Sequence, residues 1–112
     1  MINMLTHEFG IMQEDPEPQK RYDRSTPESY GCIAVSDDFI LPRCTELKAL
    51  KCFWHTLERP GSGLAYHGVT LIPPESLEGF MDILWDEPEL SELMTLLAKA
   101  QQENKYVIHF GI

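Results

Sequence analysis

Four histidines are the residues of this sequence best suited to chemistry near neutral pH, and each falls in a segment expected to form a β-strand. They are His7, His55, His67 and His109. The segments 51–57 and 64–72 flank a turn-forming stretch, and a hairpin centred on Gly61 places His55 directly opposite His67. Directly opposed side chains lie about 4.5–5.5 Å apart at Cβ. At that separation two imidazoles can share a metal ion or titrate as a coupled pair.

A complete metal site would need further ligands, because a structural zinc ion usually has four. His109 is expected on the far edge strand, roughly 9.6 Å or two strand spacings from His67, with Cys32 on the strand between them. The alternative is that the histidines are hydrogen-bonded within the sheet, and a slip of register by one residue would abolish the pairing of His55 with His67. The sequence therefore predicts no cofactor and leaves a metal site at His55 and His67 open.

The other face of the same hairpin carries aromatic rings, hydroxyl groups and a glycine, which could line a small-molecule pocket. These residues are Trp54, Thr56, Tyr66, Gly68 and Thr70. They could equally belong to the core or to an interface. Together with the histidines they define a candidate ligand site made of Trp54, His55, Tyr66, His67 and His109.

Signatures of catalysis are weak. Ser62 lies in a glycine-rich stretch that a hairpin turn explains, without the G-x-S-x-G pattern of a nucleophile elbow. The sequence has no P-loop and no G-x-G-x-x-G motif after a strand. Cys52 and His55 are three residues apart in one strand and therefore point to opposite faces. The sequence leaves open whether the protein is an enzyme, although the pattern favours a protein that is not an enzyme. No residue is assigned a catalytic role.

The chain is strongly acidic, with 18 Asp and Glu against nine Lys and Arg and a net charge of −9. Nucleic acids and anionic membranes attract Lys and Arg, so neither is an expected partner. No Lys or Arg occurs from Pro60 to Ala98, and this stretch carries a row of carboxylates. They belong to Glu75, Glu78, Asp82, Asp86, Glu87, Glu89 and Glu92. These side chains could form a solvated helical face or a docking surface for a basic protein.

A length of 112 residues fits a single domain. Residues 1–13 are expected to form an extended lead-in, and residues 14–29 a polar loop that contains three prolines. Residues 30–112 follow the order β-α-β-β-α-α-β. The longest apolar runs are too short to span a bilayer. Three cysteines without C-x-x-C spacing, and no secretion signal, predict a cytoplasmic protein.

The order of elements predicts an α+β fold, a ferredoxin-like split β-α-β two-layer sandwich with an extra N-terminal strand or extended segment. The apolar runs Cys32–Val35 and Leu64–Ile72 are expected in the centre of the sheet. A helix is expected from Pro42 to Leu50, after a first turn near Asp37–Leu41. Two more helices follow from apolar spacing of three and four residues. Their buried faces are expected to hold Leu77, Phe80, Met81 and Leu84, and then Leu90, Leu93, Met94, Leu97 and Ala98.

Three segments carry a resemblance to a group of small acidic bacterial proteins of unknown function. They are His7-Glu8-Phe9-Gly10, Gly68-Val69-Thr70-Leu71-Ile72-Pro73-Pro74 and Val107-Ile108-His109-Phe110-Gly111-Ile112. The resemblance implies a bacterial, cytoplasmic protein. It implies no activity and no functional residue.

The leading hypothesis is a non-catalytic binding protein that acts through its acidic helices or through an open face of the sheet. Its partner would be a basic protein, or a second copy of the chain docked through the sheet. The alternative is a small-molecule or metal-binding protein that uses His55 and His67 together with the face of Trp54 and Tyr66.

Overall fold

The structure is a computed structural model that describes residues 5–112, and it is an α+β fold built on one antiparallel six-stranded sheet. The strands are β1 (Thr6–Ile11), β2 (Ile33–Ser36), β3 (Lys51–Trp54), β4 (Pro60–Ser62), β5 (Val69–Ile72) and β6 (Val107–Phe110). The helices are α1 (Asp37–Ile40), α2 (Cys44–Leu47), α3 (Leu77–Leu84) and α4 (Ser91–Gln102). Short 3-10 turns lie at 27–30, 41–43, 74–76 and 88–90.

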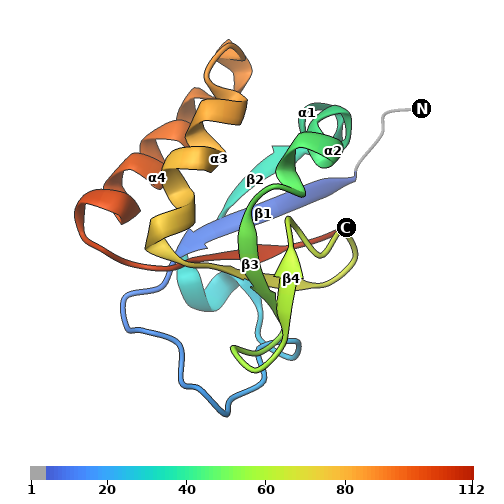
Figure 1. Cartoon of the computed structure of the whole chain (residues 1–112). Helices are drawn as coiled ribbons and strands as arrows, with labels where there is room; N and C mark the ends of the chain where they lie inside the picture. The colour runs from blue at the N-terminus through green and yellow to red at the C-terminus, as the bar shows by residue number, and fades with distance from the viewer. Residues whose placement is uncertain (1–4) are drawn as a thin grey trace.

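The two longer helices form where the apolar spacing predicts them, and they cover one face of the sheet (Figure 1). Leu77, Phe80 and Leu84 of α3 are fully buried, as are Leu93 and Leu97 of α4. A period of three and four residues therefore identified the buried side of each helix correctly.

The helix predicted from Pro42 to Leu50 is reduced to short pieces. Ser36 caps α1 by accepting a hydrogen bond from the backbone N–H of Asp38 (3.2 Å). A 3-10 turn that contains Pro42 follows, and α2 is a single turn that ends at Leu47. Proline lacks an N–H donor and clashes with the preceding turn, so it interrupts the helix here rather than starting one.

The order of strands in the sheet is β2-β1-β6-β5-β3-β4, which differs from the ferredoxin-like order predicted above. The N-terminal segment is an interior strand, since β1 pairs with β2 on one side and with β6 on the other. Cys32–Val35 was predicted in the centre, and its strand β2 lies instead at the edge. The apolar run could not distinguish a central strand from an edge strand, because the helical layer buries Val35 even though β2 lies at the edge.

The predicted hairpin register is also wrong. Strand β3 ends at Trp54, since His55 has a φ of +70°, and β3 pairs with β5 so that Phe53 faces Leu71 and Trp54 faces Thr70. The expected turn 58–63 contains the edge strand β4, which pairs with the other side of β3. Residues 64–68 lie outside any strand, and His67 is therefore not placed opposite His55.

The face of the sheet away from the helices is covered, which contradicts the open face predicted from the sequence. The loop 12–32 runs beneath the sheet (Figure 1), and Met12 and Tyr22 are buried against Leu71, Ile108 and Phe110. The Tyr22 hydroxyl accepts a hydrogen bond from the backbone N–H of Glu17 (2.9 Å), which holds the loop in place.

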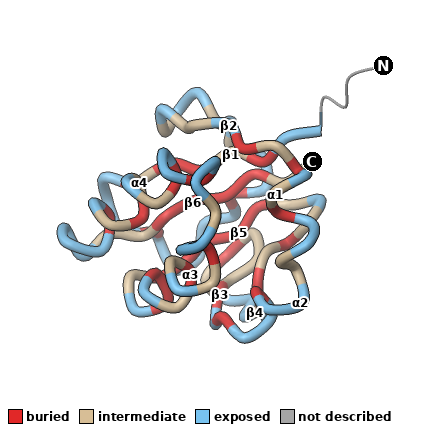
Figure 2. The backbone as a smooth tube through the Cα atoms, turned by 90° about the horizontal axis from the view of Figure 1, so that it is seen from above, coloured by how far each residue is buried: buried red, intermediate tan, exposed pale blue. Residues whose placement is uncertain are grey.

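The central strands are consequently buried from both sides, and exposed backbone is concentrated at the rim of the molecule (Figure 2). All four residues of β5 and all four of β6 are buried. Any polar side chain on these strands has to find its hydrogen-bond partners inside the protein.

Tyr22→Ala is expected to lower the free energy of unfolding by about 3–5 kcal/mol, because it removes the aromatic ring that covers the lower face. Tyr22→Phe keeps the ring and loses only the contact with Glu17, so its cost should be about 1 kcal/mol. Urea denaturation of both variants measures the difference. Equal stability of the two variants would show that the ring does not seal this face.

Candidate functional site

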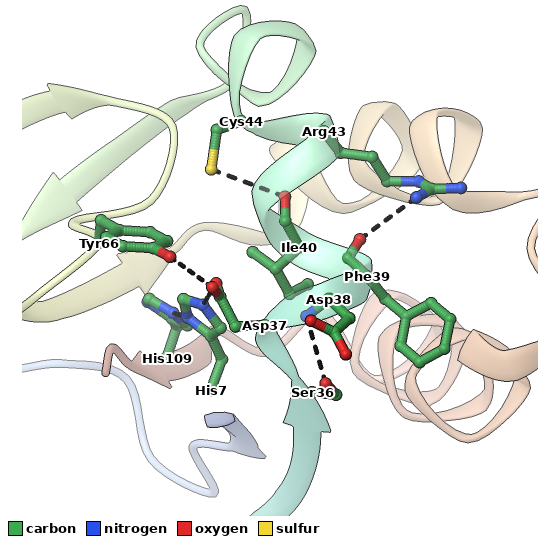
Figure 3. A network of polar contacts seen from close by, with 10 residues as sticks. All are labelled: His7, Ser36, Asp37, Asp38, Phe39, Ile40, Arg43, Cys44, Tyr66 and His109. Atoms are coloured by element: carbon green, nitrogen blue, oxygen red, sulfur yellow. Dashed lines mark hydrogen bonds and ion pairs between the residues drawn. The ribbon is translucent and has the colours of Figure 1, made fainter. Parts of the chain in front are cut away.

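Five polar residues form a hydrogen-bonded network on the helical side of the sheet, and Figure 3 shows four of them, His7, Asp37, Tyr66 and His109. Three interior strands contribute His7 from β1, His109 from β6 and Thr70 from β5. Asp37 is the first residue of α1, and Tyr66 lies in the loop before β5. We refer to these five residues as the histidine network.

The strand register brings the three strand residues together. His109 lies directly opposite Phe9 in β1 and directly opposite Thr70 in β5. His7 is two residues from Phe9, so it projects from the same face, diagonally across from His109. Strand β2 runs directly into α1, and its pairing with β1 places Asp37 beside His7.

Four hydrogen bonds link the network end to end. The hydroxyl of Thr70 lies 3.1 Å from His109 Nδ1, and His109 Nε2 lies 2.8 Å from His7 Nδ1. His7 Nε2 lies 2.8 Å from Asp37 Oδ1, and the Tyr66 hydroxyl donates to Asp37 Oδ2 over 2.6 Å. The backbone N–H of Ala65 donates to the Thr70 hydroxyl over 2.8 Å.

One arrangement of protons that satisfies every contact has both imidazoles neutral. The Asp37 carboxylate can only accept, so His7 carries a proton on Nε2, and in this arrangement it has a free lone pair on Nδ1. His109 must then donate from Nε2 to His7, which leaves its own Nδ1 as an acceptor for the Thr70 hydroxyl. Both imidazoles are neutral in this arrangement, and the single negative charge lies on Asp37.

Burial and hydrogen bonding shift the protonation of the network. His7 and His109 are fully buried, and Asp37 is 4% exposed. Burial, with the nearby His7 as a second cause, holds the pKa of His109 well below its usual value of 6.5. Burial alone would raise the pKa of Asp37, but the hydrogen bonds from Tyr66 and His7 hold that pKa below its usual value. The bond to Asp37 raises the pKa of Tyr66 to about 12.

This geometry supports a structural role for the histidine network. Its proton donors and acceptors are used within the protein, and within residues 5–112 every buried side-chain nitrogen and oxygen has a partner. The two histidines and Thr70 have no exposed surface through which a substrate could reach them. The described part of the chain holds no cluster of three or more His, Cys, Asp or Glu side chains suited to a metal ion.

Only two of the five residues predicted as a ligand site, Tyr66 and His109, belong to the histidine network. Trp54 donates from Nε1 to the carbonyl of Gly63 (2.9 Å). The ring of His55 packs on Gly68 so closely that a Cβ atom at that glycine would collide with it. The remaining member, His67, is exposed, and its ring contacts the ring of Tyr66 edge-on.

His7 and Asp37 belong to the network, but neither is among the residues predicted from the sequence as a ligand site. The signal in the sequence was the alternation of His7 with Phe9 and Ile11, which placed all three on one buried face of a strand. A histidine on such a face requires buried partners. Asp37 could be recognised only as a residue at a helix start, because its partners are distant in the sequence.

The cysteines are poor nucleophiles in this fold. Burial, together with the nearby carboxylates of Glu8 and Glu28, raises the pKa of Cys32 to about 11. Burial raises the pKa of Cys52 to about 12. Burial also raises the pKa of Cys44, whose thiol contacts the carbonyl of Ile40. Since the thiolate is the reactive form, none of the three is activated.

The predicted acidic residues lie on the surface of the helical layer. Six of the seven are exposed and one, Glu87, is half-buried: Glu75, Glu78, Asp82, Asp86, Glu87, Glu89 and Glu92. Glu87 caps the turn at 88–90 by accepting from the backbone N–H of Glu89 (3.3 Å). Arg43 contacts two of the seven, at 3.5 Å from Asp86 Oδ1 and 3.8 Å from Glu87 Oε2.

A large aromatic residue in the middle of this acidic stretch was missed. Trp85 follows α3 directly and is 76% exposed, the largest exposed fraction among the large hydrophobic side chains of residues 5–112. The sequence signal was its position one residue beyond Leu84, outside the buried stripe of α3.

Among the described residues, none of the helices has the length and apolar character needed to cross a membrane.

His7→Phe is expected to lower the free energy of unfolding by about 2–5 kcal/mol, because it leaves Asp37 Oδ1 and His109 Nε2 without partners in the interior. The control is His67→Phe, an exposed position where the change should be within about 0.5 kcal/mol. Chemical denaturation at neutral pH gives both values. A loss in His7→Phe no larger than in the control would show that the network contributes nothing to stability.

The free energy of unfolding should fall as the pH drops below about 6.5, because the unfolded chain protonates His109 and the folded chain does not. One such proton contributes a slope of at most about 1.4 kcal/mol per pH unit. His109→Gln should reduce the slope measured between about pH 6.5 and pH 5, above the range where carboxylates titrate. His67→Gln is the control and should keep it. An unchanged slope in His109→Gln contradicts the assignment of a neutral, buried His109.

Comparison with known proteins adds no assignment to this geometry. No protein-family model, curated protein or solved structure matches the chain significantly. The function therefore has to be inferred from the surface and the interior of this protein alone.

Proposed function

We propose that this protein is a non-catalytic binding module that docks a basic protein segment on an acidic surface centred on Trp85. The single observation that carries the proposal is an exposed tryptophan set among carboxylates, with Asp82, Asp86 and Glu89 as its neighbours along the chain. We refer to these four residues as the tryptophan surface.

The chemistry of the tryptophan surface suits lysine and arginine. Asp82 lies three residues before Trp85, and residues at this spacing share one side of a helix. Arginine and lysine side chains stack on the face of an indole ring, and carboxylates beside the ring add charge attraction. Tryptophan is also among the residues that contribute most to binding energy at protein interfaces.

Arg43 contacts one residue of the tryptophan surface, Asp86. Its side chain is mostly buried, donates to the carbonyl of Phe39 (3.2 Å), and lies within ion-pair distance of Asp86 and Glu87. These contacts tie the segment after α1 to the turn that follows α3. The same segment exposes Leu41, with 56% of its surface accessible.

The placement of the potentially catalytic side chains in the interior favours a binding role for this protein over a catalytic one. The groups with catalytic chemistry, His7, His109 and Asp37, are enclosed and saturated with hydrogen bonds. The free cysteines and the resemblance to small acidic bacterial proteins support a cytoplasmic setting for this function.

The alternative, a small-molecule or metal-binding protein, depended on a register that pairs His55 with His67, and β3 and β5 pair in a different one. Docking of a second copy through an open sheet face is equally weakened, because the loop 12–32 covers that face. We therefore base the proposal on the helical side.

Trp85→Ala and Asp82→Asn are each expected to abolish capture of a basic protein partner from a lysate of the source cells, and raised salt should weaken capture by the wild type. Glu46→Gln removes one exposed carboxylate from α2, outside the tryptophan surface, and should capture the partner normally. Affinity capture followed by mass spectrometry makes the comparison. A partner retained equally by all the variants would contradict the proposed surface.

A further inference from the structure

The outer edge of β2 is a second feature of the surface with the properties of a binding site. Strand β2 is the last strand on its side of the sheet, and no described segment pairs with its outer edge. Natural sheet edges are usually protected by proline, by lysine or by extreme shortness. The opposite edge follows this rule, since β4 is three residues long and begins with Pro60. Strand β2, with the sequence Ile-Ala-Val-Ser, carries no charge and no proline.

A groove lies at one end of this edge, where β1 ends and β2 begins. It encloses about 430 Å³ between the ends of β1 and β2 and the flank of α4. Its apolar wall is made of Ile11, Ile33 and Leu96, while Glu92 and Lys99 stand at its rim. A strand added to β2 would place every second side chain on the helical side of the sheet, and the one beside Ile33 would reach this groove.

The other face of the same edge is acidic. Ala34 is exposed there and lies directly opposite Glu8 of the neighbouring strand, so the two side chains share that face. Burial raises the pKa of Cys32, the residue before β2, and the carboxylates of Glu8 and Glu28 raise it further. The remaining side chains of an added strand would therefore meet carboxylates.

We propose that the β2 edge binds an extended peptide segment of alternating apolar and basic residues, which adds to the sheet as a seventh strand. One apolar residue would enter the groove at Ile33 and Leu96, and the basic residues would face Glu8 and Glu28. The backbone of β2 would supply the hydrogen bonds, as in other cases of strand addition. This site contains no residue of the tryptophan surface.

A second copy of the chain is a poorer occupant of the same edge. Antiparallel pairing of β2 with another β2 would bring the carboxylates of both copies together, and each copy carries a net charge of −9. Like charges across an interface oppose association. A basic peptide replaces that repulsion with attraction.

The test uses ¹⁵N-labelled protein and a blocked octapeptide that alternates valine and lysine. The amide signals of residues 33–36 should shift during the titration, and their hydrogen exchange should slow, because new backbone hydrogen bonds form there. An octapeptide that alternates valine and glutamate is the matched probe and should leave these signals in place.

Variants on the acidic face sharpen the test. Ala34→Lys should weaken binding by about tenfold through charge repulsion, whereas Ala34→Gln, of similar length and neutral, should stay within about twofold of the wild type. Glu28→Gln should weaken binding by about two- to fivefold. Trp85→Ala should bind the peptide as the wild type does, which separates this site from the tryptophan surface.

Three results would overturn the proposal. The first is an absence of shifts in residues 33–36 with the valine–lysine peptide, including the case in which signals near Trp85 move instead. The second is an equal response to the valine–glutamate peptide. The third is a shift of the β2 signals on concentrating the protein without peptide, which would identify a second copy as the occupant.

Discussion

The arrangement of the interior depends on one constraint, the need of Asp37 and two fully buried histidines for hydrogen-bond partners. A buried carboxylate without partners is costly in free energy, and so is a buried imidazole. The histidine network meets this need by joining β1, β5, β6, the start of α1 and the loop before β5. These five segments come from distant parts of the sequence, and a shift of register in any of the strands would leave at least one of the groups unpaired.

The constraint also determines where function can reside. The side chains most capable of acid–base chemistry are placed inside, where they fix the geometry of the sheet. The two proposed binding surfaces are made of exposed groups: the carboxylates around Trp85 on the helical layer, and the unprotected edge of β2. Both proposals call for basic partners, which suits a chain with a net charge of −9.

The sequence predicted the parts of the fold that follow from local pattern. The positions of α3 and α4 and their buried faces follow from apolar spacing. Strand order was not predicted, because β1 enters between β2 and β6 through pairing with residues far away in the chain. The positive φ of His55 shortened β3 and changed its register, and a non-glycine residue gives no warning of this conformation. His7 and His109 are 102 residues apart in the chain, so no local pattern could pair them.

The most direct test of the structural role of the histidine network is long-range ¹H–¹⁵N NMR of the imidazole nitrogens as a function of pH. The structure predicts that His7 carries a proton on Nε2, from which it donates to Asp37, and that His109 stays neutral well below 6.5, the usual pKa of the side chain. A His7 ring without a proton on Nε2, or ordinary titration of His109 near that value, would contradict the closed network. Either result would make the two histidines candidates for a reactive site.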